Sequence, residues 1–292
     1  MPTCYRHPNR ETGVSCANCG RPICPDCMTT TPVGMRCPEC SRQRTVVKTI
    51  RNTARRPELT IALIAINVAV FLTEGNFSFG GGPTGSVYEK GALFGSDPVV
   101  PTQGVAHGQW WRLVTSGFLH ENLIHIGFNM YVLWILGQML EPALGRLRFG
   151  LIYGVALLTG SFGALLITPH SPTVGASGAV FGLMGAAAVE MRARQIPIMQ
   201  SGVGGLILIN LVISFTLPGI SWGGHVGGLL GGALAAVLLR LGERSRSRAL
   251  ALAGCVVIAV AAVAGSIAIS KSSEVKTSTL VIPSGEGAAP EG

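Results

Sequence analysis

A succession of apolar runs is the feature that most constrains this chain. Each run is near the length of about 20 residues that a helix needs to cross the hydrocarbon core of a membrane. Because a backbone in lipid must satisfy its own hydrogen bonds, each run is predicted to be helical. We place seven transmembrane helices near residues 59–76, 118–140, 148–167, 176–192, 201–217, 222–240 and 249–269. The sequence therefore predicts an all-α polytopic membrane protein.

The composition agrees with this prediction. Of the 292 residues, 48% are hydrophobic and 12% are charged, and the mean hydropathy is +0.47, which is typical of a membrane protein. A net charge of +8 would also fit a nucleic-acid-binding protein. The Lys and Arg residues, however, lie in short clusters at the ends of the apolar runs, where anionic lipid and membrane topology explain them better. We expect the lipid bilayer as a partner and no nucleic acid.

Arginines also predict the orientation, because positively charged connections stay in the cytoplasm. With the N-terminus inside, seven helices leave these residues on the cytoplasmic side: Arg146, Arg148, Arg192, Arg194, Arg240, Arg244, Arg246 and Arg248. No signal peptide is expected, since the first apolar run begins only near Leu59. We expect a multi-pass protein of the cell membrane with a cytoplasmic N-terminus.

Four segments follow from these patterns. Residues 1–40 hold a cysteine-rich module, 41–58 a basic linker and 59–270 the transmembrane domain. Residues 271–292 are rich in Ser, Gly, Pro and Ala and lack an apolar period, so we predict a disordered tail.

The cysteine-rich module has the pattern of a metal site. Seven of the eight cysteines form CxxC or CxxH pairs near the N-terminus, and in a reducing compartment such pairs favour zinc over disulfides. Eight ligands fill two tetrahedral sites without an open position, so both Zn²⁺ ions would be structural. A segment with so few apolar residues should need the metal to fold. The predicted ligands are Cys4, His7, Cys16, Cys19, Cys24, Cys27, Cys37 and Cys40.

The alternating order of the pairs resembles the cross-brace of B-box-like zinc modules. This resemblance implies one site formed by Cys4, His7, Cys24 and Cys27 and a second formed by Cys16, Cys19, Cys37 and Cys40. Sequential pairing stays open as an alternative, and so does the question of whether the module binds a protein partner, lipid or nothing. Cys255, in the last apolar run, is interpreted as a small buried hydrophobe.

Polar residues inside three of the predicted helices suggest a functional site, because such residues are costly in a membrane. His125 and Asn129 lie on one face of the second helix, Ser177 opens the fourth, and His225 opens the sixth. The predicted topology puts all of them in the outer half of the membrane. These side chains can therefore lie close together in one site.

Small residues explain how the fourth and sixth helices would meet. Each carries a small-xxx-small ridge that permits close backbone contact. The ridges are Gly178, Gly182 and Ala186 in one helix and Gly224, Gly228 and Gly232 in the other. Ser177 neighbours the first ridge and His225 the second, so a hydrogen bond between them would supply a nucleophile activated by a general base.

Acyl transfer also needs donors for the developing oxyanion, and the candidates are His125, Asn129 and the Ser177 backbone N–H. Glu141 and Glu190 belong at the cytoplasmic helix ends, so we predict a dyad whose histidine is oriented by packing. No cofactor is expected for catalysis. The alternative is structural: a membrane Ser often bonds back to its own helix, and a membrane His such as His120 can be a satisfied interhelical donor or lie at the interface.

From about Gly108 to Arg240 the chain resembles the rhomboid intramembrane proteases. The motifs that carry this resemblance appear in order: Trp111-Arg112, His125-xxx-Asn129, Gly175-Ala176-Ser177-Gly178 and His225-xx-Gly228-xxx-Gly232. The resemblance implies a six-helix bundle with a water-filled cavity open to the outer side, here followed by one more C-terminal transmembrane helix. It implies cleavage of membrane-protein segments as the activity.

The resemblance also implies roles for single residues. Ser177 and His225 would form the catalytic dyad, and His125 and Asn129 would bind the oxyanion. Phe181, one turn after Ser177, would stack on the His225 ring, at a position that is commonly tyrosine in this family. Trp111 and Arg112 look like loop anchors at the membrane interface.

A protease in lipid must unwind its substrate, because a helix hides its carbonyls in hydrogen bonds. We therefore expect membrane-protein substrates with Gly, Ala, Ser or Pro near the outer boundary. Two other functions compete with this one. A non-catalytic rhomboid-like protein that binds membrane clients would be marked by loss of Ser177 or His225, and both are present. A transporter would keep its function in Ser177→Ala.

Overall fold

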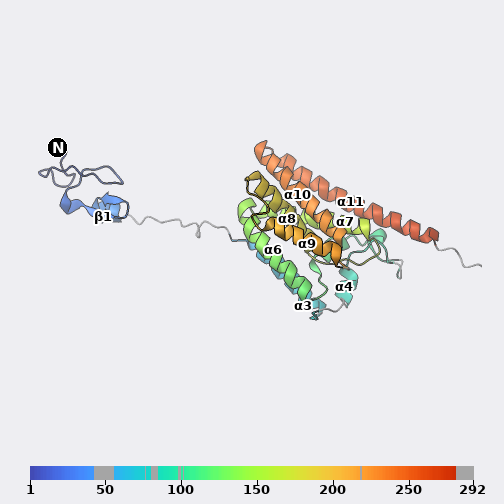
Figure 1. Cartoon of the computed structure of the whole chain (residues 1–292). Helices are drawn as coiled ribbons and strands as arrows, with labels where there is room; N and C mark the ends of the chain where they lie inside the picture. Colours follow the sequence, from blue (N-terminus) through green and yellow to red (C-terminus); the bar gives the residue numbers. More distant parts are fainter. Residues whose placement is uncertain are drawn as a thin grey trace, which may run out of the picture. The chain divides into compact units, whose positions relative to one another are not determined.

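The computed structural model describes residues 1–42, 56–75, 77–79, 85–97, 100, 102–217 and 219–280. Most of the predicted basic linker and residues 281–292 of the predicted tail lie outside these residues. The chain divides into two compact units, Met1–Ala54 and Arg55–Gly292, and each is considered by itself (Figure 1).

The N-terminal unit has little regular structure. It contains the 3₁₀ helix η1 (Pro25–Cys27), the strands β1 (Thr29–Thr31) and β2 (Gly34–Arg36), and the helix α1 (Pro38–Arg42). The strands pair antiparallel, with Thr30 opposite Met35. Ile23 is buried in this unit together with Cys4, Cys16, Cys24, Cys27, Cys37 and Cys40. Its core therefore consists largely of the predicted metal ligands.

The second unit contains all seven predicted transmembrane helices, which confirms the predicted fold class. They are α3 (Glu58–Glu74), α6 (Leu123–Leu144), α7 (Arg146–Ile167), α8 (Ser177–Ala193), α9 (Val203–Thr216), α10 (Trp222–Arg244) and α11 (Arg248–Leu280). Among the described residues, four helices are long and apolar enough to span a membrane, namely α6, α7, α10 and α11. The helices α3 and α8 have 17 residues each, at the short end of the spanning range, and α9 has 14.

Short elements lie in the connection between α3 and α6, ahead of the second helix, which the sequence placed near residues 118–140. They are α4 (Ser86–Gly91), η2 (Val105–His107), α5 (Arg112–Thr115) and η3 (Ser116–Phe118). The predicted start of the second helix was wrong because Asn122 caps α6: its side chain accepts a hydrogen bond of 2.9 Å from the His125 backbone N–H.

The helix α11 continues to Leu280, so the predicted boundary of the tail at residue 271 was also wrong. The Ser270 hydroxyl donates to Ser266 O at 2.7 Å, and the Ser273 hydroxyl donates to Ser270 O at 2.8 Å. Glu274 forms an ion pair of 3.1 Å with His107 in η2. Composition averaged over the segment hid this extension, because its Gly and Pro residues all follow Leu280.

The helix α10 packs most extensively against α7 and α8, while α11 lies against α7 and α10, and α3 pairs with α6 (Figure 1). The predicted ridge contact between α8 and α10 is present. A Cβ added at Gly228 would lie 2.0 Å from Gly178 O, and one at Gly232 would lie 2.3 Å from Gly182 O. Only glycine permits this approach of the two backbones.

A second glycine ridge of α10, offset by one residue, faces α7. A Cβ added at Gly223 would lie 2.4 Å from Gly163 O, and one at Gly227 would lie 2.5 Å from Thr159 O. The helix α10 is therefore packed closely on two sides, which fixes both its depth and its rotation.

Glu141 and Glu190 lie away from the Ser177 end of α8, as the sequence predicted. Glu141 is buried in α6 and accepts hydrogen bonds from Leu59 N (2.9 Å), Thr60 N (2.8 Å) and Thr60 Oγ1 (2.7 Å), so it satisfies the first turn of α3. Glu190 lies near the C-terminal end of α8 and pairs with Arg240 of α10 at 3.0 Å.

Candidate functional site

The turn before α8 presents Ser177. Gly175 has φ +124°, a conformation that favours glycine, and its N–H donates to Ser116 O at 2.9 Å. A Cβ added at Gly175 would lie 2.7 Å from His125 Nε2. Glycine is therefore needed twice at this position, for the backbone conformation and for the approach of the His125 ring to the start of α8.

Ser177 and His225 are brought together across the α8–α10 contact. His225 lies in the first turn of α10, after the N-cap Ser221, and its side chain is 8% exposed. The distance from His225 Nε2 to Ser177 Oγ is 2.8 Å. This distance lies within the range for a nucleophile hydrogen-bonded to its general base.

Phe181 lies one turn after Ser177 and stacks on the His225 ring. The ring centroids are 4.2 Å apart, and the planes differ by 12°. Both side chains are buried, so Phe181 limits the rotation of the imidazole.

Ser214 of α9 contacts the other ring nitrogen of His225, and sequence reasoning missed it. Its Oγ lies 2.6 Å from His225 Nδ1 and 2.6 Å from Asn210 O. The sequence does contain a signal for this residue. Asn210 and Ser214 are spaced i, i+4 in the fifth apolar run, as His125 and Asn129 are in the second.

His125 and Asn129 line the same cavity as Ser177 and His225, and the cavity volume is about 430 Å³. The Asn129 amide donates to His125 O at 3.1 Å, which uses one of its two N–H groups. The first intrahelical bond of α8 runs from Val180 N to Ala176 O, so the Ser177 N–H belongs to the uncommitted first turn. The cavity thus contains candidate donors from two helices.

The structure contradicts the interpretation of His120 as a satisfied interhelical donor. It is fully buried, and in the part of the chain that the structure describes neither ring nitrogen has a hydrogen-bond partner. Its ring packs edge-on against His125, with centroids 5.1 Å apart. Its position therefore supports the orientation of His125.

Arg112 is buried inside the protein and fixes the preceding loop. It is 1% exposed and donates from Nη1 to Glu89 O (2.8 Å) and Ala92 O (2.7 Å). Trp111 is exposed and donates from Nε1 to Lys90 O at 3.1 Å. Both side chains thus hold α4 and the turn after it, as loop anchors, but only Trp111 reaches the surface.

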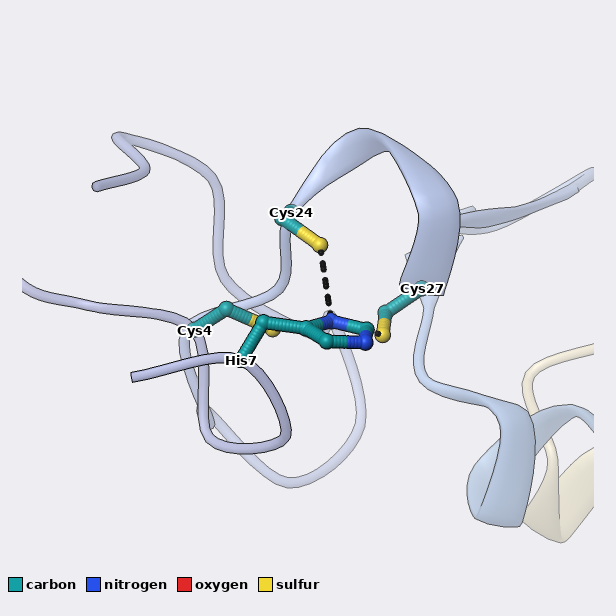
Figure 2. A group of neighbouring side chains, drawn as sticks. All are labelled: Cys4, His7, Cys24 and Cys27. Atoms are coloured by element: carbon teal, nitrogen blue, oxygen red, sulfur yellow. Dashed lines mark hydrogen bonds between the residues drawn. The ribbon is translucent and has the colours of Figure 1, made fainter. Parts of the chain in front are cut away.

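The eight predicted N-terminal ligands form two groups with the alternating arrangement. Figure 2 shows the first, in which Cys4, Cys24 and Cys27 surround the His7 ring; Nδ1 lies 3.3 Å from Cys24 Sγ and 3.4 Å from Cys27 Sγ. The candidate ligand atoms in this group all lie within 4.8 Å of one another. Such a group can hold a metal ion.

The second group consists of Cys16, Cys19, Cys37 and Cys40, again with ligand atoms within 4.8 Å of one another. The Cys37 backbone N–H donates to Cys16 Sγ at 3.3 Å, and this bond is the largest of the effects that lower the pKa of Cys16 to about 6. A thiolate is the form that binds metal.

Comparison with known proteins matches residues 107–242 to the family model described as Rhomboid domain. The chain is 35% identical over 189 residues to "Rhomboid protease GluP" of Bacillus subtilis (strain 168), covering 64% of this chain and 36% of GluP. It is 38% identical over 171 residues to "RHOMBOID-like protein 6, mitochondrial" of Arabidopsis thaliana, covering 56% of this chain and 53% of that protein.

A third relative, YdcA of Bacillus subtilis (strain 168), is 35% identical over 139 residues, which cover 46% of this chain and 70% of YdcA. The chain therefore spans about a third of GluP, about half of the plant protein and more than two thirds of YdcA. With the family domain covering α6 to α10 and the apolar helices around them, the chain is a multi-pass membrane protein that belongs to the rhomboid family.

Proposed function

We propose that this protein is an intramembrane serine endopeptidase that hydrolyses peptide bonds in or near transmembrane segments of membrane proteins. One observation carries the proposal: in a rhomboid-family chain, Ser177 Oγ and His225 Nε2 lie 2.8 Å apart at the wall of a cavity of about 430 Å³. The cavity gives a substrate carbonyl access to a hydroxyl that already has a base beside it.

In the proposed mechanism, Ser177 Oγ attacks the scissile carbonyl carbon while His225 Nε2 accepts the hydroxyl proton. His225 then donates that proton to the leaving amine, and an ester remains on Ser177. Water attacks the ester, again with His225 as base, and restores both side chains. Because His225 must be unprotonated to act, the rate should fall as the pH becomes acidic.

Three donors serve the oxyanion in this proposal: His125, Asn129 and the Ser177 N–H. The N-terminal end of α8 adds the positive end of a helix dipole at the point where negative charge develops. Phe181 holds the His225 ring by stacking, and its lack of a hydroxyl removes any hydrogen bond that a tyrosine would make there.

The proposed orientation puts the N-terminus in the cytoplasm and the cavity toward the outer side. Ser177 and His225 begin their helices, while Arg192 and Arg240 lie near the opposite ends of the same helices. Thiol labelling of the intact cell by a membrane-impermeant reagent tests this. We expect Ser171→Cys to react from outside and Ser247→Cys to react only after the membrane is opened; the reverse pattern would overturn the orientation.

We further propose that each N-terminal group holds one structural Zn²⁺. In a tetrahedron with zinc–sulfur bonds of about 2.3 Å, two ligand sulfurs lie about 3.8 Å apart. Cys19 Sγ and Cys37 Sγ lie 3.8 Å apart. Sulfur and imidazole ligands with no open position suit a structural zinc ion, so the metal would hold the fold of this unit and take no part in catalysis.

The test of the protease is cleavage of single-span reporters in liposomes by the full chain. We expect cleavage by the wild type and none by Ser177→Ala or His225→Ala, with all three proteins showing the same thermal unfolding. Absence of cleavage by folded wild type across several reporters would overturn the protease and favour a client-binding protein. Equal cleavage by Ser177→Ala would assign the activity to another residue.

Two matched reporters test the proposed substrate class. One carries Gly and Pro near its outer boundary, and the other has leucine at the same positions. We expect faster cleavage of the first, because its helix unwinds more easily. Equal rates would contradict a requirement for local unwinding.

A further inference from the structure

A buried hydroxyl on α9 lies against the His225 nitrogen that faces away from Ser177. Ser214 is 3% exposed, and its Oγ lies 2.6 Å from Nδ1 of His225, which is itself 8% exposed. In the mechanism proposed above, this ring nitrogen has no role of its own. The contact comes from α9, whereas Ser177 and Phe181 come from α8, so the imidazole is held from two helices.

The direction of this hydrogen bond follows from the chemistry of the partners. Ser214 Oγ also lies 2.6 Å from Asn210 O, one turn back in α9. A carbonyl oxygen can only accept, so the single hydroxyl proton of Ser214 is donated to Asn210. The contact with His225 then requires Nδ1 to carry the hydrogen and Ser214 Oγ to accept it.

A neutral imidazole carries one N–H, so a hydrogen on Nδ1 leaves Nε2 with its lone pair. Nε2 is the atom that lies 2.8 Å from Ser177 Oγ. We propose that Ser214 is a positioning residue of this site: its Oγ accepts Nδ1–H of His225 and so keeps Nε2 free to accept the Ser177 proton. This inference rests on the proposed protease function. The sequence predicted that packing alone orients His225, whereas here a hydrogen bond to Ser214 orients it as well.

The same bond has a second consequence during turnover. When His225 has accepted the proton, both ring nitrogens carry hydrogen, and Ser214 Oγ continues to accept from Nδ1. A bond to a charged donor is stronger than one to a neutral donor, so the contact stabilises the protonated intermediate more than the resting state. Its loss should therefore lower kcat and leave KM nearly unchanged.

The first experiment compares the turnover of full-length Ser214→Ala, Ser214→Thr and Ser266→Ala in liposomes. Ser214→Ala should reduce kcat roughly tenfold to hundredfold. Ser214→Thr should recover most of the rate, because a helical threonine keeps a hydroxyl bonded to the carbonyl one turn back. Ser266 is the matched control, since it is equally buried and bonds back to Ala262 O at 2.7 Å but lies on α11.

The second experiment reads the His225 tautomer directly, by nitrogen-15 NMR of histidine-labelled protein, with the His225 signal assigned by its loss in His225→Ala. The wild type should show hydrogen on Nδ1, and Ser214→Ala should show a mixture of tautomers. An unchanged tautomer, or wild-type kcat in Ser214→Ala, would overturn the role of Ser214. If the wild type cleaves nothing but the tautomer shifts as expected, the hydrogen bond stands and the protease function fails.

Discussion

In the cysteine-rich unit most buried side chains are candidate metal ligands, whereas in the membrane unit the closest helix contacts are made by glycines. Ile23 is surrounded by cysteines that point toward two shared centres. Gly228 and Gly232 instead allow the backbone of α10 to touch that of α8. Large apolar side chains such as Leu133, Phe149 and Leu183 fill the rest of the membrane unit's core, and the cysteine-rich unit has no comparable cluster among its described residues.

The cysteine clusters and the glycine contacts should be sensitive to different changes. A ligand cluster depends on a metal ion and on deprotonated thiols, so chelators, acid and oxidants disrupt it. A glycine contact depends only on shape, so the addition of one methyl group disrupts it. Different treatments should therefore unfold or destabilise the two units.

The largest expected effect is that of a zinc chelator. Structural zinc contributes roughly 10–16 kcal/mol to the folding of zinc-finger peptides, so its removal should unfold the cysteine-rich unit completely. Limited proteolysis of the full chain should then cut within residues 1–42, while the thermal unfolding of the membrane unit should not change. Cys16→Ser should reproduce the effect and Cys255→Ser should not; resistance of the unit to both chelator and Cys16→Ser would contradict a metal-held fold.

The next effect is that of Gly228→Ala. The new Cβ would meet Gly178 O at 2.0 Å, and overpacking of this kind costs roughly 1–3 kcal/mol. Because α8 and α10 also carry Ser177 and His225, a shift of about 1 Å should lower cleavage roughly 100-fold. Thermal unfolding and reporter cleavage measure the two effects. Gly154→Ala is the control, since its Cβ would meet nothing within 4 Å, and equal behaviour of the two variants would contradict the role of the ridge.

Glu141→Gln tests a polar contact inside the membrane unit. Glu141 accepts three hydrogen bonds from the first turn of α3, and the amide can accept fewer, so we expect a loss of about 1–3 kcal/mol in the free energy of unfolding. Arg146→Gln breaks the exposed pair with Glu58, where less than about 1 kcal/mol is expected. Denaturant unfolding in detergent compares the two. A larger loss in Arg146→Gln would contradict this ranking.

Among the changes at the catalytic site, Phe181→Leu should have the smallest effect. Aromatic stacking contributes about 0.5–1.5 kcal/mol beyond buried area, which corresponds to a decrease of roughly twofold to twelvefold in kcat. Phe181→Tyr keeps the ring and should stay near the wild-type rate in the reporter assay. A wild-type rate in Phe181→Leu would show that Ser214 alone suffices to hold His225.

Much of this fold could be predicted because membrane helices leave strong signals in a sequence. The apolar runs gave the helices, and the Gly224, Gly228 and Gly232 spacing gave the contact between α8 and α10. The order of the cysteine pairs likewise pointed to the alternating grouping. Each of these patterns involves residues close together in the sequence, so it can be recognised without knowing how the rest of the chain folds.

What escaped prediction depends on contacts between distant segments. Arg112 organises the loop before α6 through carbonyls of Glu89 and Ala92, and carbonyls carry no sequence signature. The contact between Glu274 and His107 joins residues far apart in the chain, so the extension of α11 could not be read from composition. Ser214 was missed for a different reason: a serine inside an apolar helix usually bonds back to its own backbone, so its sequence position did not mark it as a partner of His225.

The most direct test of the catalytic assignment is covalent labelling of the full chain by a fluorophosphonate, with the modified residue mapped by mass spectrometry. The account predicts one adduct, on Ser177, formed at a rate that falls sharply in His225→Ala and stays unchanged in Ser266→Ala. Labelling at another residue, or equally fast labelling of Ser177 without His225, would contradict a serine activated by the histidine of α10.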